Sequence, residues 1–193
     1  MRKLVLLLNV LVLFVICAGD ALAEPKSGFG LNLGATSNKM DGATIPGGTA
    51  YAYSSTGMSV GIDYQFAVSD SFSINPIFMS SGEDASGSTL QAGTSAGHGI
   101  LGLQLRYWMG DAFIGGHIGK YVEVLSTVTT VNGNTTVATD VGASGGGRGL
   151  VLGWEPSSSK WFVMGQIDTA SIDYLAANVK LTGYRLSIGY RWK

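Results

Sequence analysis

Two histidines are the first residues to examine for chemistry, because histidine is the side chain best suited to act as a base near neutral pH. His98 lies three residues after Ser95, and Glu83 and Asp84 precede it in the same polar stretch. Hydrolases and acyltransferases combine a serine, a histidine and a carboxylate, with the base within hydrogen-bond reach of the nucleophile. Here only proximity along a serine-rich stretch is evident, and His117 lies apart among glycines. We therefore predict no catalytic residues and no enzyme.

Metal-binding and phosphate-binding patterns are equally weak. No group of His, Asp and Glu residues has the spacing of metal ligands. The glycine run from Gly145 to Gly149 lacks the Lys-Ser/Thr ending and the following helix of a phosphate-binding loop. We interpret it as a bend in a strand, with Arg148 extending toward a polar boundary. No metal site and no cofactor are predicted.

The first 23 residues have the pattern of a cleaved signal peptide. A positively charged start, an apolar run and the small-residue pattern Ala21-Leu22-Ala23 follow one another. We expect residues 1–23 to be removed and residues 24–193 to form one exported domain. The single cysteine, Cys17, lies in the removed part, so the mature domain has no thiol chemistry.

The composition limits how the mature domain can fold. Charged residues make up 13% of the chain, against about 25% in soluble domains. A net charge of −1 without a basic stripe argues against nucleic-acid binding. No apolar run after residue 23 is long enough for a membrane helix, and in a bilayer only helices and closed barrels satisfy every backbone polar group. Such a chain can meet lipid only as a β-barrel.

Apolar and polar residues alternate along eight stretches, as they do in strands with one apolar face. The last stretch, 184–192, is the clearest, because its aromatic and aliphatic residues alternate strictly with polar residues or glycine. The eight stretches lie near 28–35, 58–66, 72–78, 101–107, 113–124, 150–154, 161–168 and 184–192.

Two residues interrupt this alternation. Lys120 falls on the otherwise apolar face formed by Ile118 and Val122, which predicts either a bulge or a different assignment of the two faces. Pro76 cannot donate a ladder hydrogen bond, and we expect a local bulge there.

The connections alternate between long and short. The long ones lie near 37–56, 80–96, 125–146 and 171–178, and the short ones lie near 69–71, 109–111 and 156–160. Transmembrane barrels have this pattern, with tight periplasmic turns and longer outer loops. We therefore predict an all-β fold, an eight-stranded antiparallel up-and-down transmembrane β-barrel with both mature termini on the periplasmic side.

The four tryptophans lie beside short turns or at the C-terminus. In the predicted barrel this places them at one membrane interface, where amphipathic rings are favoured. We expect a periplasmic aromatic girdle that contains Trp108, Trp154, Trp161 and Trp192.

With these strands, loops and the final stretch LTGYRLSIGYRWK, the mature chain resembles the small eight-stranded outer-membrane barrels of the OmpA transmembrane-domain and OmpX type. The resemblance covers the whole mature chain and concerns architecture more than activity. It implies the outer membrane of a Gram-negative-type bacterium. It also implies contact with outer-membrane lipids, lipopolysaccharide and the barrel-assembly machinery.

Eight strands enclose a space that side chains can fill. Buried charges need partners, and Asp168 and Arg185 fall at similar heights on adjacent predicted strands. We expect them to form an ion pair, with Asp63 and Arg106 nearby and Arg191 in the same polar interior. A polar plug that holds the barrel in register is the favoured interpretation. A gate or narrow conduction path is the alternative.

The third outer loop reads TVTTVNGNTTVAT over 127–139. Asn132-Gly133 between Thr- and Val-rich runs is a strong hairpin signal, so two strands should continue outward as a ribbon. The resemblance implies a surface that could bind extracellular proteins by edge pairing. A solvated loop without a ligand is the alternative.

Three functions are compatible with these features. The leading one is a structural or surface-interaction (adhesin-like) protein of the outer membrane. A narrow porin-like channel for small solutes is second. An enzyme that modifies lipid A, an activity of some small outer-membrane barrels, is third.

Overall fold

The computed structural model describes five parts of the chain, and both the predicted signal peptide and the predicted hairpin tip Asn132-Gly133 lie outside them. Side chains are not described for 127–141, 174 or 177. The described ranges are 25–42, 52–87, 94–131, 134–174 and 177–192.

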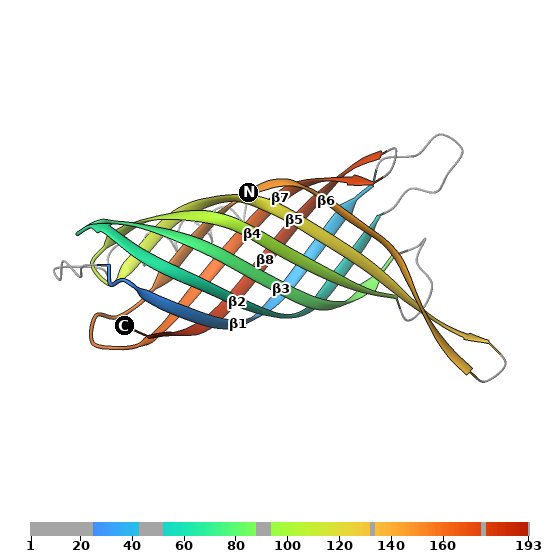
Figure 1. The fold of residues 1–193 in the computed structure, drawn as a ribbon, viewed down its shortest axis with the longest axis horizontal. Helices are drawn as coiled ribbons and strands as arrows, with labels where there is room; N and C mark the ends of the chain where they lie inside the picture. Colours follow the sequence, from blue (N-terminus) through green and yellow to red (C-terminus); the bar gives the residue numbers. More distant parts are fainter. Residues whose placement is uncertain (1–24, 43–51, 88–93, 132–133, 175–176, 193) are drawn as a thin grey trace, which may run out of the picture.

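Eight antiparallel strands form a closed barrel in which each strand pairs with its neighbours in sequence and β1 closes on β8 (Figure 1). The predicted fold class is confirmed. In the part of the chain that the structure describes, no helix is long and apolar enough to span a membrane. The strands are β1 (Gly28–Asp41), β2 (Tyr53–Ser69), β3 (Phe72–Ser86), β4 (Thr94–Met109), β5 (Ala112–Val131), β6 (Asn134–Trp154), β7 (Trp161–Tyr174) and β8 (Ala177–Trp192).

The strands are strongly staggered. A row of directly paired residues followed once around the barrel returns to β1 ten residues further along, at Met40 instead of Gly30. Such a shear tilts the strands by roughly 35–45° to the barrel axis. Directly paired residues therefore lie at different heights along the axis. The row runs through Gly30, Asp63, Ile77, Gly102, Gly119, Gly147, Ala170, Leu181 and Met40.

The two faces of the wall have inverted polarity compared with a soluble protein. Large apolar residues such as Leu33, Leu101 and Leu186 are exposed on the outside. Polar residues such as Asn75, Gln104 and Arg191 are buried inside. Soluble domains place charged residues in water and apolar residues in the core. The alternation thus places an apolar surface outside and a largely polar filling inside.

Neither Lys120 nor Pro76, the two residues that interrupt the alternation, lies at a bulge. Lys120 is exposed on the outer face, and the register shift between β5 and β6 comes later, between Val124 and Leu125. Pro76 is also exposed and lies opposite Leu103 of β4 with no register shift, so the predicted bulge at Pro76 is wrong. A proline is tolerated there because its missing N–H interrupts only one side of the ladder.

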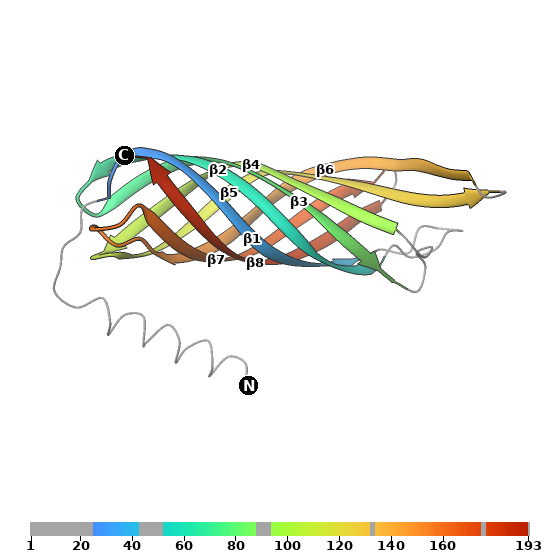
Figure 2. The same cartoon turned by 90° about the horizontal axis from the view of Figure 1, so that it is seen from below.

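The two ends of the barrel differ. Short turns join β2 to β3, β4 to β5 and β6 to β7 at the end where β1 begins and β8 ends (Figures 1 and 2). In the β4–β5 turn, Gly110 has φ of 64°, a left-handed conformation that favours glycine. At the opposite end β5 and β6 project beyond the other strands (Figure 1).

Candidate functional site: the barrel interior and the outer ribbon

An ion cluster occupies the interior near the short-turn end. It consists of Asp63 on β2, Arg106 on β4, Arg191 on β8, and Glu155, which follows β6. Asp63 Oδ2 accepts hydrogen bonds from Arg106 Nη2 at 3.2 Å and from Arg191 Nη2 at 3.1 Å. Arg191 Nε donates to both Glu155 oxygens at 3.0 Å. Two cations and two anions, all buried, therefore neutralise one another.

Amides and aromatic rings complete the surroundings of the two arginines. Arg106 Nε donates to Gln104 Oε1 at 2.6 Å, and Arg106 Nη1 donates to Gln65 Oε1 at 3.0 Å. Arg106 lies 4.6 Å from the ring centroid of Phe113, and Arg191 lies 5.1 Å from that of Phe162. Stacked rings and a full set of hydrogen bonds are what a buried guanidinium requires.

Inward-facing glycines make room for those rings. A Cβ on Gly153 would overlap the ring of Phe113, and a Cβ on Gly189 would overlap the ring of Phe162. Part of the high glycine content thus follows from fitting aromatic rings inside a narrow barrel.

A second group of interior side chains lies further along the axis, and its contacts differ from the predicted ion pair. Asp168 contacts His117 Nε2 at 2.9 Å and accepts a hydrogen bond from Gln166 at 2.9 Å. Arg185 points to Met79 Sδ at 2.6 Å. The predicted ion pair between Asp168 and Arg185 does not form. Gln166 is the direct partner of Arg185, and Asp168 is paired by His117, which reaches it from β5.

A third group, the outer polar group, lies toward the projecting end. Glu83 lies 3.2 Å from His98 Nδ1 and accepts a hydrogen bond from Ser81 at 2.6 Å. His98 Nε2 lies 3.2 Å from the Tyr53 hydroxyl, which also contacts Glu123. All of these side chains are buried. Sequence reasoning noted Glu83 near His98 but missed Tyr53 and Glu123, which come from strands distant in sequence.

The geometry separates the residues of the possible hydrolase. Ser95 and His98 are three residues apart on one strand, so their side chains lie on opposite faces of the wall. His98 is buried inside, whereas Ser95 donates to the backbone oxygen of Ser126 at 3.4 Å. Asp84 is exposed on the outside, away from His98. The surface arrangement of serine, histidine and acid is therefore not formed by these residues.

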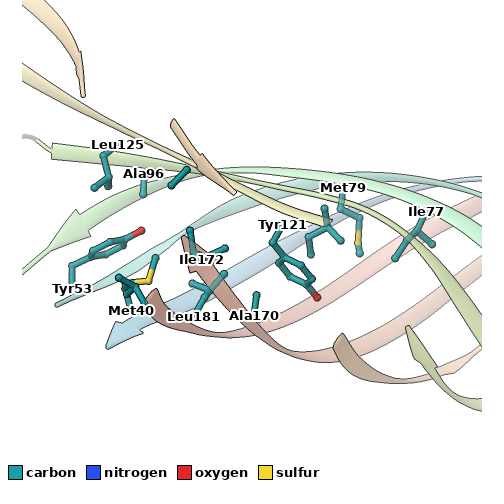
Figure 3. Close-up of a cluster of buried hydrophobic side chains, with 13 residues drawn as sticks. Met40, Tyr53, Ile77, Met79, Ala96, Tyr121, Leu125, Ala170, Ile172 and Leu181 are labelled. Carbon is teal, nitrogen blue, oxygen red and sulfur yellow. The ribbon is translucent and has the colours of Figure 1, made fainter. Parts of the chain in front are cut away.

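The outer half of the interior also holds apolar side chains that were not expected. Met40, Ile172 and Leu181 pack in one buried cluster with Tyr53 (Figure 3). The cluster fills space between the polar groups on several strands. Within the described ranges, no group of three or more His, Cys, Asp or Glu side chains is arranged to hold a metal ion.

The tryptophans divide between the two faces. Trp154, Trp161 and Trp192 are exposed on the outside near the short-turn end. Trp108 is only 5% exposed, lies inside, and donates from Nε1 to Ser73 Oγ at 3.0 Å. Its placement in the girdle is wrong, because Tyr107 faces outward and the next residue must face inward.

The outer ribbon, residues 126–131 and 134–139, is the second candidate site. β5 and β6 stay paired up to Val131 and Asn134. β4 accompanies β5 only to Thr127, and β7 accompanies β6 only from Ser144 onward. Among the described residues, the edge of β6 from Asn134 to Ala143 therefore has no second partner strand.

Comparison with known proteins shows the fold and leaves the activity open. No model of a known protein family matches the chain, and no curated protein matches it. One similar structure is that of Ail, the attachment invasion locus protein of Yersinia pestis, in complex with sucrose octasulfate. Its sequence is 12% identical to this chain, and the two structures match with a TM-score of 0.59 over 86% of this chain and 99% of that chain. Neisserial surface protein A is 10% identical, with a TM-score of 0.54 over 86% of this chain and 98% of that chain. The resemblance to the small eight-stranded outer-membrane barrels is thus confirmed for the fold.

Proposed function

We propose that this chain is an outer-membrane surface protein that binds another protein through its outer ribbon, while its filled barrel serves as the anchor. The open edge of β6 is the observation that carries the proposal. An unpaired edge presents a row of backbone N–H and C=O groups that an extended segment of a partner can join as a new strand.

The outer surface supports placement in a membrane. On β1 the outward residues include Phe29 and Leu33 near the short-turn end and Ser37, Lys39 and Asp41 near the other end. Exposed tryptophans lie at the short-turn end, as in the aromatic girdles of such barrels. In this orientation the short turns and both mature termini are periplasmic and the ribbon is extracellular. Lipids, lipopolysaccharide and the barrel-assembly machinery are the partners that the location requires.

The fold is shared with a protein that is named for attachment. Ail is called the attachment invasion locus protein and was crystallised with a heparin analogue. At 12% identity the likeness extends to the fold only. It supports the idea that such a barrel can present binding surfaces outside the cell.

Replacing residues 126–139 with Asn-Gly should remove the ribbon and leave the barrel intact. Leu125 and Asp140 are cross-strand partners, so a two-residue turn can join them. We expect cells that display the variant to bind immobilised extracellular-matrix and serum proteins no better than cells without the protein. The heat-dependent change of electrophoretic mobility of a folded barrel should be retained. Undiminished binding by a correctly displayed variant would contradict the proposal.

A narrow channel is the second candidate, and one observation favours it. Buried polar atoms on Asn32, Gln166, Arg185 and Ser187 have no hydrogen-bond partner within the described residues. Such atoms are commonly satisfied by internal waters. A hydrated region does not by itself make a continuous path, because the ion cluster crosses the interior nearer the short-turn end.

Planar-bilayer recordings distinguish a filled barrel that serves only as an anchor from a barrel that conducts ions. We expect no stable conductance steps, because the two arginines of the ion cluster are held by carboxylates within 3.2 Å and cannot move aside without separating buried charges. Arg185→Ala should be equally silent. Stable steps that disappear in Arg185→Ala would instead establish conduction past this residue.

The lipid A-modifying enzyme is supported least. His98 and Ser95 lie on opposite faces of β4, so neither face presents both groups to a lipid. Lipid A from cells with and without the protein should give the same mass spectrum.

A further inference from the structure

The outer ribbon has two free backbone edges of unequal length. β4 pairs with β5 as far as Thr127, so the edge of β5 is free only over residues 128–131. The edge of β6 is free over residues 134–143, because β7 first pairs with β6 at Ser144. Both views show the ribbon standing clear of the other strands (Figures 1 and 2). Among the residues that the structure describes, β6 therefore offers the longer edge to a further strand.

The hydrogen-bonding pattern of the ribbon decides which backbone groups its free edges present. β5 ends at Val131 and β6 begins at Asn134, and these two residues are cross-strand partners. Residues that flank a two-residue turn bond to each other, so the N–H and C=O of Asn134 point toward β5. This direction reverses at each following residue of the strand. The residues of β6 that direct their N–H and C=O groups to the free edge are therefore Thr135, Val137 and Thr139.

The free edge of β6 is self-complementary about Val137. Residues 134–140 read NTTVATD. When two such strands lie antiparallel with Val137 opposite Val137, Thr135 of one copy stands opposite Thr139 of the other. The groups that face the two free edges then meet, and each opposed pair exchanges two hydrogen bonds. Opposed threonines are favourable cross-strand neighbours, and residues 126–146 contain no Lys, Arg or Pro of the kind that protects edge strands from pairing.

The charge of the ribbon is compatible with this register. Over residues 124–147 the only charged residue is Asp140. In the register about Val137, Asp140 of each copy stands opposite Asn134 of the other, so the two negative charges lie at opposite ends of the paired segment. At 3.3 Å per residue they are about 20 Å apart, well beyond the screening length of about 8 Å at physiological ionic strength. A register that places Asp140 opposite Asp140 is unfavourable.

The direction of β6 determines which second copy can supply the partner strand. β6 runs from the ribbon tip toward the barrel. Two copies in one membrane project the same way, so their β6 strands cannot lie antiparallel. Copies in two facing membranes project toward each other, and a two-fold axis between them makes the two strands antiparallel.

We propose that the free edge of β6 pairs with the same edge of a second copy in a facing outer membrane, and so joins cells that display the protein. This inference rests on the proposed function, because it names a partner for the same open edge. A single contact of this length is weak, but many copies on two facing surfaces bind together, which strengthens the attachment without any further contact.

The test of the register uses the mature protein in phosphatidylcholine vesicles of two colours, with joined vesicles counted by fluorescence cross-correlation. Vesicles should join only when both carry the protein. Val137→Asp and Val137→Lys should each lower joining at least about tenfold, because like charges then face each other at the two-fold axis. Vesicles with Val137→Asp should join those with Val137→Lys. Undiminished joining by either variant alone, or a mixture that joins no better than the separate variants, would overturn the proposal.

The test of the edge is Val137→Pro, with Thr130→Pro as the matched control in the same ribbon. Thr130 is the cross-strand partner of Thr135, so the same alternation directs its N–H to the free edge of β5. A proline at either position removes only an edge-facing N–H and leaves the hydrogen bonds within the ribbon intact. Val137→Pro should lower joining at least about tenfold, and Thr130→Pro should join like the unaltered protein. Equal joining by the two variants would show that the edge of β6 is not the contact.

The failure of this inference is distinguishable from that of the proposed function. Vesicles that carry the folded protein and do not join, together with cells that bind matrix or serum proteins through the ribbon, would contradict only the pairing between copies. Undiminished binding of those proteins after removal of residues 126–139 would contradict the proposed function. Electrophoretic mobility before and after heating shows that each variant is folded.

Discussion

Replacement of Asp63 with alanine is expected to lower the free energy of unfolding by about 3–5 kcal/mol, the cost of leaving a buried charge uncompensated. One oxygen of Asp63 serves both Arg106 at 3.2 Å and Arg191 at 3.1 Å. Removal of this carboxylate takes from Arg106 its ion pair with Asp63, whereas Arg191 keeps its ion pair with Glu155. Urea unfolding in lipid vesicles, followed by tryptophan fluorescence, measures the loss.

The matched control is Asp84→Ala, because Asp84 is an exposed carboxylate on the neighbouring strand. We expect it to change the free energy of unfolding by less than about 0.5 kcal/mol. Asp63→Asn should fall between the two, since the amide retains a hydrogen-bond acceptor but not the charge. A loss below about 1 kcal/mol for Asp63→Ala would mean that water compensates the arginines and that the interior is more open than the ion cluster implies.

The ion cluster also explains how a polar interior can specify one barrel. Its members come from β2, β4 and β8 and from the segment after β6, so one group of side chains connects much of the circumference. A shift of one residue in any of these strands would turn the charged side chain toward the outside. We infer that the cluster disfavours shifted registers, consistent with the plug predicted from the sequence.

Most of the architecture could be predicted because it depends on local alternation. Each residue of a strand faces opposite to the next, so a run such as 184–192 assigns its faces without knowledge of the rest. The five charged residues assigned to the interior are all buried in the structure. They are Asp63, Arg106, Asp168, Arg185 and Arg191.

The choice of partners could not be predicted in the same way. Asp168 was matched with Arg185 because the two lie close together along the wall. In the structure its partner is His117, on a strand that is not adjacent to β7. Contacts across the interior depend on the stagger of the whole barrel and on side-chain length, and neither follows from one strand's sequence. For the same reason the contact of Tyr53 with Glu123 could not be predicted from the sequence.

The wrong placement of Trp108 in the girdle has a different cause, because the local alternation along β4 is enough to show that its side chain faces inward. Nearness to a short turn gives the height of a residue along the axis, while alternation gives its face. The height of Trp108 is that of the girdle, but the alternation along β4 turns its side chain inward. Lys120 is the opposite case. The simple alternation puts it on the outer face with Ile118 and Val122, and the structure has it exposed there, so neither a bulge at Lys120 nor a different assignment of the faces is needed.

Trp108→Ala should therefore be among the most destabilising single changes outside the ion cluster. The ring is buried against Phe113, with ring centroids 4.9 Å apart, and its Nε1 donates to Ser73. Loss of a buried tryptophan leaves a cavity and costs about 3–5 kcal/mol. The buried Ser73 hydroxyl also loses the Trp108 N–H as a partner, although it still donates to Asn75. Urea unfolding of the variant in vesicles can be followed with the three remaining tryptophans.

Trp154→Ala provides the comparison, since it removes the same side chain from the outer face of the same end. Trp154 is 45% exposed, and its loss leaves no interior cavity, so we expect a cost below about 1 kcal/mol. Quenching by lipids brominated in their acyl chains should affect Trp154 and leave Trp108 largely unaffected, because only the former faces lipid. Equal destabilisation and equal quenching of both would mean that Trp108 belongs to the girdle after all, and that β4 is shifted by one residue near its end.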